Sequence, residues 1–180
     1  MQKYISDPLL IGGKKFDMRI YALVTSYSPL TVYLYRSGFA RFTHVRYDET
    51  KITQSEMHLT NVAIQKNSDN YDEIIGGKWY LDKLKIYLSS KYGHDKTNLG
   101  FYKIQEIIIK TLEALQKTMA SDRNNSFELY GFDILFDSRL DPWLIEVNGS
   151  PSMTANTSDD YKLKMGLLED TLLVVDMDKL

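Results

Sequence analysis

Three oxygen-bearing side chains near the C-terminal end of the sequence lie at spacings that suit a metal ion. Asp133 lies in one segment of alternating apolar and polar residues, and Glu146 and Asn148 lie two positions apart in the next. If the two segments form a β-hairpin around residues 138–141, its register pairs positions 137 with 142, 135 with 144, 133 with 146 and 131 with 148. Two carboxylates then stand opposite each other. Like charges in that position repel, unless one carboxyl is protonated or a cation lies between them.

Oxygen donors with no His or Cys among them favour a hard ion. We therefore predict Mg²⁺, held by Asp133, Glu146 and Asn148, in preference to Zn²⁺. Mg²⁺ takes only a few protein ligands and completes its octahedron with phosphate oxygens and water, and Gly131 leaves room for a bulky ligand beside the backbone. The alternative is that Asp133 and Glu146 are solvent-facing strand residues in a different register.

A second group of charged residues suits phosphate chemistry. Lys15, Asp17 and Arg19 alternate along one face of a predicted strand, and Arg41 lies in a later strand of the same antiparallel meander. Together these side chains can hold phosphate oxygens and neutralise charge that develops during phosphoryl transfer. The alternative is a wet strand face on which Asp17 bridges two cations.

The elements that must position these side chains follow from periodicity. Period-two alternation predicts a half-buried strand at 15–25, with Phe16 and Met18 on its apolar face, and returning strands at 31–36 and 39–43 around a turn at Gly38. Helical spacing of apolar residues predicts two helices, at 81–88 and 101–119. The other predicted elements are a strand or loop at 58–64, loops at 65–77 and 91–98, strands at 127–136 and 143–148, with Trp143, Ile145 and Val147 on one apolar face, and a last helix capped by Ser158, Asp159 or Asp160. The fold class is α+β, with a largely antiparallel sheet flanked by helices.

Composition excludes several classes of function. The sequence has no cysteine, which excludes disulfide frameworks, thiolate zinc sites and cysteine nucleophiles and suits a reducing, intracellular compartment. No apolar run reaches the roughly 18–20 residues that span a bilayer, so we expect no membrane span. Acidic residues outnumber basic ones, 24 to 22, which argues against nucleic acid as a partner.

Taken in order along the chain, these segments resemble the tubulin tyrosine ligase-like family, a branch of the ATP-grasp ligases, and most of all its polyglutamylase members. The matching stretches are 2–5, 15–19, 33–41, 58–61, 130–133 and 143–151. Any one of them is weak, whereas the ordered set covers almost the whole chain. The resemblance implies a single domain, residues 1–180, that forms the C-terminal part of an ATP-grasp fold, with the N-terminal lobes absent.

The resemblance also implies a role for each candidate residue. Adenine contacts fall on Gln2, Lys3, Tyr4 and Ile5, and further nucleotide contacts fall on His58, Thr60 and Asn61. Phosphates and substrate carboxylates would be lined by Lys15, Asp17, Arg19 and Arg41, with the two arginines steadying the reacting anions. Asp133, Glu146 and Asn148 would hold Mg²⁺, as the hairpin register suggests independently.

The implied reaction is tubulin polyglutamylation, in which ATP and Mg²⁺ drive addition of free glutamate to glutamate side chains of tubulin or microtubule tails through an acylphosphate. Such an enzyme acts in the cytoplasm on the cytoskeleton, including the cilium axoneme or basal body, with complex subunits as further candidate partners. With half of the nucleotide clamp missing, we expect the chain alone to bind ATP weakly. The missing lobes favour an alternative, a non-catalytic, truncated interaction module of a tubulin-modifying complex. An ATP-grasp ligase for small peptides is a third reading.

Overall fold

The computed structural model describes residues 2–65, 77–119 and 126–176. Its elements are, in chain order, β1 (Leu10–Ile11), β2 (Lys14–Tyr27), β3 (Leu30–Phe42), α1 (Ser55–His58), α2 (Val62–Gln65), β4 (Lys78–Tyr80), α3 (Leu81–Tyr92), α4 (His94–Met119), β5 (Glu128–Phe136), β6 (Pro142–Asn148) and α5 (Ser158–Val175). The strands form one sheet in the order β4-β3-β2-β5-β6, with β1 beside β2, and every pairing is antiparallel. The predicted α+β class with an antiparallel sheet is confirmed.

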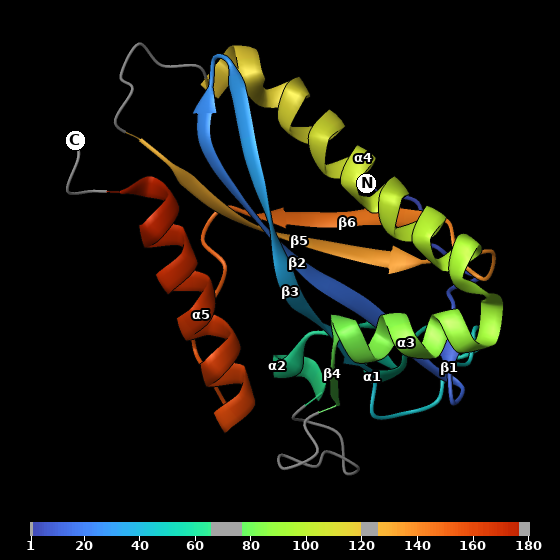
Figure 1. The fold of residues 1–180 in the computed structure, drawn as a ribbon. Helices are drawn as coiled ribbons and strands as arrows, with labels where there is room; N and C mark the ends of the chain where they lie inside the picture. The colour runs from blue at the N-terminus through green and yellow to red at the C-terminus, as the bar shows by residue number, and fades with distance from the viewer. Residues whose placement is uncertain (1, 66–76, 120–125, 177–180) are drawn as a thin grey trace.

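Helices pack on both faces of this sheet (Figure 1). Helices α3 and α4 share one apolar core with β2 and β5, which includes Phe16, Met18, Ile20, Leu84, Ile108, Leu112, Phe132 and Ile134. Helix α5 packs on the other face, where Leu163 and Leu167 contact Tyr21 and Phe39. The strand predicted at 15–25 is confirmed as part of β2, but its predicted half-burial was wrong, because β2 is buried on both faces from Lys15 to Val24.

Strand β3 runs without a break through Gly38, so the predicted turn there was wrong. The pairing register with β2 shifts between Ile20 and Ala22, which places a bulge in β3 beside the glycine. A Cβ on Gly38 would lie 2.4 Å from the backbone oxygen of Arg19 and 2.8 Å from Leu81 Cδ1. The glycine therefore permits a close approach of backbone rather than a change of direction.

Two further predicted segments contain helix where none was expected, although residues 59–61 form a loop, as one of the two predictions for 58–64 allowed. Residues 58–64 contribute to α1 and α2, and the side chain of Gln65 holds this region by donating to the carbonyls of Glu56 and Leu59 and accepting from the amide of His44. The predicted loop at 91–98 is reduced to Gly93, whose φ of +89° ends α3 just before α4 begins. The predicted loop at 65–77 falls, over 66–76, outside the described residues.

The two long helices were otherwise predicted correctly from their apolar spacing. Helix α5 begins one residue after its cap, which is Thr157 and not any of the three residues predicted: the Thr157 hydroxyl accepts a hydrogen bond from the amide of Asp160. Within the described ranges, none of the helices combines the length and the apolar character that crossing a bilayer demands.

The β5–β6 hairpin confirms the half of the predicted register that matters for the site. Asp133 pairs with Glu146 and Gly131 pairs with Asn148. The register then shifts by one residue between Asp133 and Ile134, so the predicted pairs of 135 with 144 and of 137 with 142 were wrong. The residue left over in β6 is Ile145, which forms a β-bulge.

Beyond this bulge the alternation of β6 inverts. Leu144 and Val147 pack against the apolar core, although a regular strand would turn them to opposite faces. Trp143 and Ile145 were predicted to share an apolar face with Val147, which was wrong. Instead, Trp143 donates its indole N–H to Asp137 at 3.1 Å, and Ile145 lines a pocket on the other face.

Candidate functional site

Eight of the nine predicted nucleotide-binding residues line one pocket of about 250 Å³, which we call the N-terminal pocket. They come from the segment before β1, from β2, and from the end of α1 with the loop that follows: Gln2, Lys3, Tyr4, Ile5, Lys15, Asp17, His58 and Thr60. Apolar side chains of Leu59, Leu135 and Ile145 complete the wall. A pocket with an apolar wall and a few charged groups suits a flat heterocycle joined to an anionic chain.

The polar groups of the N-terminal pocket hold one another in place. The Tyr4 hydroxyl lies 2.7 Å from His58 Nδ1 and accepts from Lys15 Nζ at 3.3 Å, while His58 Nε2 donates to the carbonyl of Lys51 at 3.0 Å. The Lys15 ammonium also lies 4.6 Å from the centre of the Tyr4 ring. Burial lowers the pKa of Lys15, and the charge of Asp17 opposes that shift. His58 is thus an oriented, buried support for Tyr4 and Lys15.

A row of buried ion pairs forms the wall behind this pocket. Cross-strand pairing places Asp17 beside Arg41 and Arg19 beside Asp133. Arg19 donates two hydrogen bonds to Asp133, from Nε at 2.5 Å and from Nη2 at 3.0 Å. Arg41 donates from Nη2 to Asp133 at 2.7 Å, and it also makes two hydrogen bonds to Asp17. Asp133 is only 2% exposed, so the network excludes water almost completely.

This network changes the charge argument made from the sequence. Burial alone would raise the pKa of Asp133, but the hydrogen bonds from Arg19 and the charge of Arg41 outweigh burial and lower it. The sequence argument allowed either a proton or a metal ion to relieve repulsion from Glu146. The structure supplies a third remedy, because two guanidinium groups already neutralise Asp133.

The remaining donors still suit a hard ion. Glu146 accepts from the amide NH₂ of Asn148 at 3.2 Å, and the same NH₂ group donates to the carbonyl of Gly131 at 3.3 Å. Both side chains line a second pocket, and carboxylate and amide oxygens are ligands that Mg²⁺ prefers. Three N–H groups already occupy Asp133, which has about four acceptor positions. Over the described part of the chain, no group of three His, Cys, Asp or Glu residues is placed to hold a metal by itself.

The second pocket has a volume of about 390 Å³ and lies beside the first; we call it the cationic pocket. Its lining includes five of the six other predicted site residues, Arg19, Arg41, Asn61, Glu146 and Asn148. The sixth, Asp133, lines neither pocket and is held by Arg19 and Arg41. The two pockets meet at chain neighbours, Thr60 with Asn61 and Ile145 with Glu146, and at the ion pair between Asp17 and Arg41. The predicted residues are therefore brought together in two adjoining compartments.

Two lysines of the cationic pocket were missed by the sequence analysis. Lys78 comes from β4 and Lys164 from α5, far from each other in sequence. The spacing of Asp160 and Lys164, four residues apart in a helix, is typical of an exposed surface pair, so it gave no sign of burial. The structure buries both of these residues.

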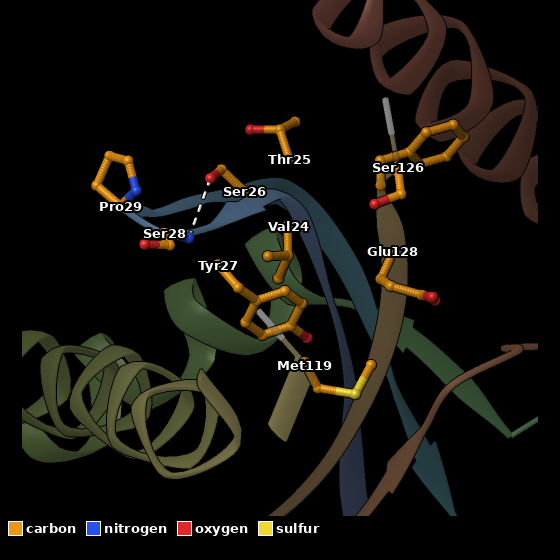
Figure 2. Close-up of a pocket in the computed structure, with 10 residues that line it drawn as sticks. Val24, Thr25, Ser26, Tyr27, Ser28, Pro29, Met119, Ser126 and Glu128 are labelled. Atoms are coloured by element: carbon orange, nitrogen blue, oxygen red, sulfur yellow. Dashed lines mark hydrogen bonds between the residues drawn. The ribbon is translucent and has the colours of Figure 1, made fainter. Parts of the chain in front are cut away.

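A third pocket, of about 310 Å³, lies at the tip of the β2–β3 hairpin (Figure 2). Val24 to Pro29 line it together with Met119 at the end of α4 and Ser126 to Glu128 at the start of β5. The predicted site residues other than the buried Asp133 line the other two pockets, so we do not assign the third pocket a part in the chemistry.

Residues 1–179 match the sequence profile of the tubulin-tyrosine ligase family. The chain belongs to that family. It is 51% identical over 177 residues to the probable tubulin polyglutamylase TTLL9 of Bos taurus, an alignment that covers 98% of this chain and 38% of that protein. It is 45% identical over 179 residues to the probable tubulin polyglutamylase ttll-9 of Caenorhabditis elegans, covering 99% and 43%.

Identity to the tubulin polyglutamylase TTLL5 of Homo sapiens is 42% over 191 residues, covering 97% of this chain and 15% of that protein. The chain thus spans less than half the length of these relatives. Membership of the tubulin-tyrosine ligase family confirms the resemblance inferred from the ordered motifs. The antiparallel sheet flanked by helices accords with the ATP-grasp-like fold of that family.

Proposed function

We propose that this chain is the C-terminal ATP-grasp domain of a ligase that uses ATP and Mg²⁺ to add glutamate to glutamate side chains of tubulin tails. The observation that carries the proposal is the arrangement of the two pockets around one row of ion pairs. The N-terminal pocket joins an apolar wall to Lys15, and the cationic pocket contains Arg19, Arg41, Glu146 and Asn148. A nucleotide with its base in the first pocket would direct its phosphates toward the second.

The reaction needs two transfers. In the first, a side-chain carboxylate of the acceptor attacks the γ-phosphorus of ATP, ADP leaves, and an acylphosphate forms. In the second, the neutral amine of free glutamate attacks the acyl carbon, phosphate leaves, and the nitrogen loses one proton and keeps the other to yield an amide. Bound Mg²⁺, held by Glu146 and Asn148, would supply charge neutralisation at the phosphates.

The arginines act as positioned donors in both transfers. Asp133 and Asp17 fix the planes of Arg19 and Arg41, so both guanidinium groups are oriented before any substrate binds. Donors that are already oriented stabilise developing negative charge without a reorganisation cost during the reaction. We propose Arg19 and Arg41 as the catalytic residues on this basis.

The substrate class rests on the relatives, which are named as tubulin polyglutamylases, and on charge. Tubulin as substrate and the microtubule cytoskeleton as location are what those names support, and tubulin tails as the acceptor are the finer substrate that we propose. The cilium axoneme and the basal body are the finer locations that we propose. A cationic pocket suits an acidic substrate segment.

Assays of the full-length protein with ATP, Mg²⁺, labelled glutamate and tubulin test the proposal. We expect glutamate incorporation that depends on all four components. Glu146→Gln should reduce the rate by at least the roughly 10–100-fold that loss of a metal's supporting partner costs, because it removes a charged ligand. The matched control is Glu106→Gln on the exposed side of α4, which should leave the rate unchanged. Unchanged incorporation in Glu146→Gln would contradict the proposed role of this residue.

A further inference from the structure

The cationic pocket contains a second charged cluster, to which the proposed reaction assigns no role. Lys78 and Lys164 both donate to the same oxygen, Oδ2 of Asp160, at 3.1 and 3.3 Å. Asp160 is 2% exposed, and the same carboxylate oxygen accepts from the amide of Asn156 at 3.3 Å. One buried acid thus holds two ammonium groups at the edge of the pocket.

Lys164 lies on the buried side of helix α5, where a charged side chain is unusual. It is only 6% exposed, and its ammonium also donates to the carbonyl of Thr154 in the loop between β6 and α5. Burial lowers its pKa, and the nearby charge of Lys78 lowers it further, while Asp160 opposes both effects. A buried lysine is retained at a cost in desolvation, so it calls for a partner of opposite charge beyond the one that it shares.

The charge balance of the pocket lining is strongly positive. Four cationic side chains line it, Arg19, Arg41, Lys78 and Lys164, against the single carboxylate of Glu146. The acids behind the lining are already engaged: Asp17 and Asp133 bind the arginines, and Asp160 is shared between the lysines. Because Lys78 and Lys164 share the single carboxylate of Asp160, this local group has two cations to one acid, an excess of positive charge that favours a small anion.

The position of the lysines separates them from the expected phosphates. Lys15 and Asp17 of the N-terminal pocket lie on β2, and β3 lies between β2 and β4, which carries Lys78. Lys164 reaches the pocket from α5, on the sheet face opposite the apolar core. The lysine pair thus lies on the side of the cationic pocket away from β2, where a second substrate, rather than the nucleotide, would bind.

We propose that Lys78 and Lys164 bind a carboxylate of the incoming free amino acid, so that the cationic pocket selects a dicarboxylic amino acid such as glutamate. This inference rests on the proposed ligase function and names a substrate subsite for it. A pocket of about 390 Å³ accommodates a small free molecule. With the arginines directed at the reacting centre, the lysine pair supplies the separate cationic end that a second carboxylate requires.

The test measures binding of labelled L-glutamate to the full-length protein, saturated with Mg²⁺ and a non-hydrolysable ATP analogue. Lys164→Met and Lys78→Met keep most of the aliphatic stem and remove the charge. Each should weaken glutamate binding at least about tenfold, the loss that one charge-assisted hydrogen bond represents, and leave analogue affinity unchanged. The matched control is Lys162→Met, two residues from Lys164 on the exposed side of α5, with a side chain that is 75% exposed.

The KM values for the two substrates show whether the lysines bind a carboxylate of free glutamate or a carboxylate of the acceptor peptide. We expect both variants to raise the KM for free glutamate and not the KM for the acceptor peptide; the reverse result would assign the lysines to the acceptor and overturn the inference. Unchanged constants in both variants would also overturn it. If Lys164→Met fails to fold, Lys78→Met provides the test, because Lys78 is less buried.

The design also distinguishes this inference from the proposed function. If the unmodified protein binds no ATP analogue, the ligase function fails, and lysine-dependent glutamate binding then still supports the subsite. If the protein incorporates glutamate into tubulin and the lysine variants bind glutamate normally, the ligase stands and the subsite is wrong.

Discussion

The two faces of strands β2 and β5 are buried to nearly the same degree by different physical means. On the face toward α3 and α4, Met18 and Ile134 are 0% exposed in an apolar core. On the opposite face, Asp17 and Asp133 are 5% and 2% exposed, and each is held by arginine. Neighbouring positions of one strand thus alternate between dispersion contacts and ion pairs.

The comparison teaches that burial alone does not distinguish a core from a site. Apolar burial is favourable at roughly 25 cal/mol per Å², and neighbouring side chains partly relax when one is trimmed. A buried ion pair roughly balances desolvation against attraction, so it adds little stability while it is complete. Removal of one partner, in contrast, strongly destabilises the protein, because the other charge stays buried without compensation. The polar face is therefore costly to break without being a source of stability, as expected of a face kept for chemistry.

Removal of Asp133 should have the largest effect. Asp133→Ala leaves Arg19 and Arg41 buried with their shared partner gone, and such a loss costs about 3–5 kcal/mol. Urea denaturation followed by tryptophan fluorescence measures the change in the free energy of unfolding. The sequence analysis assigned Asp133 only to a metal site, whereas the ion pairs predict that its removal strongly destabilises the fold.

The matched control for that substitution is Asp159→Ala in α5. Its carboxylate lies 3.7 Å from Lys162, and both side chains are largely exposed. Exposed pairs contribute roughly 0–1 kcal/mol. Equal losses in the two variants would show that the Asp133 network is no more than a surface pair.

Gly38→Ala should have the next largest effect, because Gly38 lies in close contact with both the backbone of Arg19 and the side chain of Leu81. The new methyl group would collide with the backbone oxygen of Arg19 and the side chain of Leu81, so β3 would have to move away from β2. Overpacking of this kind costs about 1–3 kcal/mol. The displaced strand β3 carries Arg41, so we also expect weaker binding of a nucleotide analogue, measured by calorimetry. Stability and affinity both unchanged would show that β3 can relax locally.

The sequence predicted the apolar face better than the polar one. Period-two spacing alone places Phe16, Met18 and Ile20 on one side of β2, as the structure confirms. It gave no sign that the face with Lys15, Asp17 and Arg19 is buried as well, because that burial depends on α5 and on cross-strand pairing with β3 and β5. Those contacts join residues 24 positions apart for Asp17 with Arg41 and 114 apart for Arg19 with Asp133, which periodicity within one segment does not encode.

The site was predicted in part for the same reason. Asp133 and Glu146 face each other as the hairpin register implied, because the extra residue at the bulge offsets the one-residue error in the pairs nearer the turn. The bulge at Ile145 was missed, since β6 has no glycine or other local signal there. Lys78 and Lys164 were missed because Asp160, which joins them, pairs with one locally and with the other only in the folded chain.

The pH dependence of the free energy of unfolding under acidic conditions should distinguish the polar face of β5, which carries Asp133, from its apolar face. The pKa of Asp133 is lowered in the folded chain, so its contribution is fully present above the unfolded value near 3.9 and is lost as pH falls toward the folded value. Below about pH 4, Asp133→Asn should therefore reduce the dependence of unfolding free energy on pH by up to roughly 1.4 kcal/mol per pH unit. Urea midpoints from pH 2 to 6 measure it. Parallel curves for both proteins would mean that Asp133 titrates alike in the folded and unfolded chain.

Ile134→Val, one position along β5 from Asp133, should have the smallest effect. It removes one methylene group from the apolar core and leaves every ion pair in place, which costs about 0.5–1.5 kcal/mol. The value is small because the surrounding side chains of α4 and β2 can relax into a cavity of that size, whereas no relaxation supplies a new charge to an arginine. Urea denaturation under the conditions used for Asp133→Ala gives a direct ratio between adjacent positions. A loss at Ile134 as large as that at Asp133 would show that the two faces tolerate change equally, and the distinction between core and site would have to rest on chemistry alone.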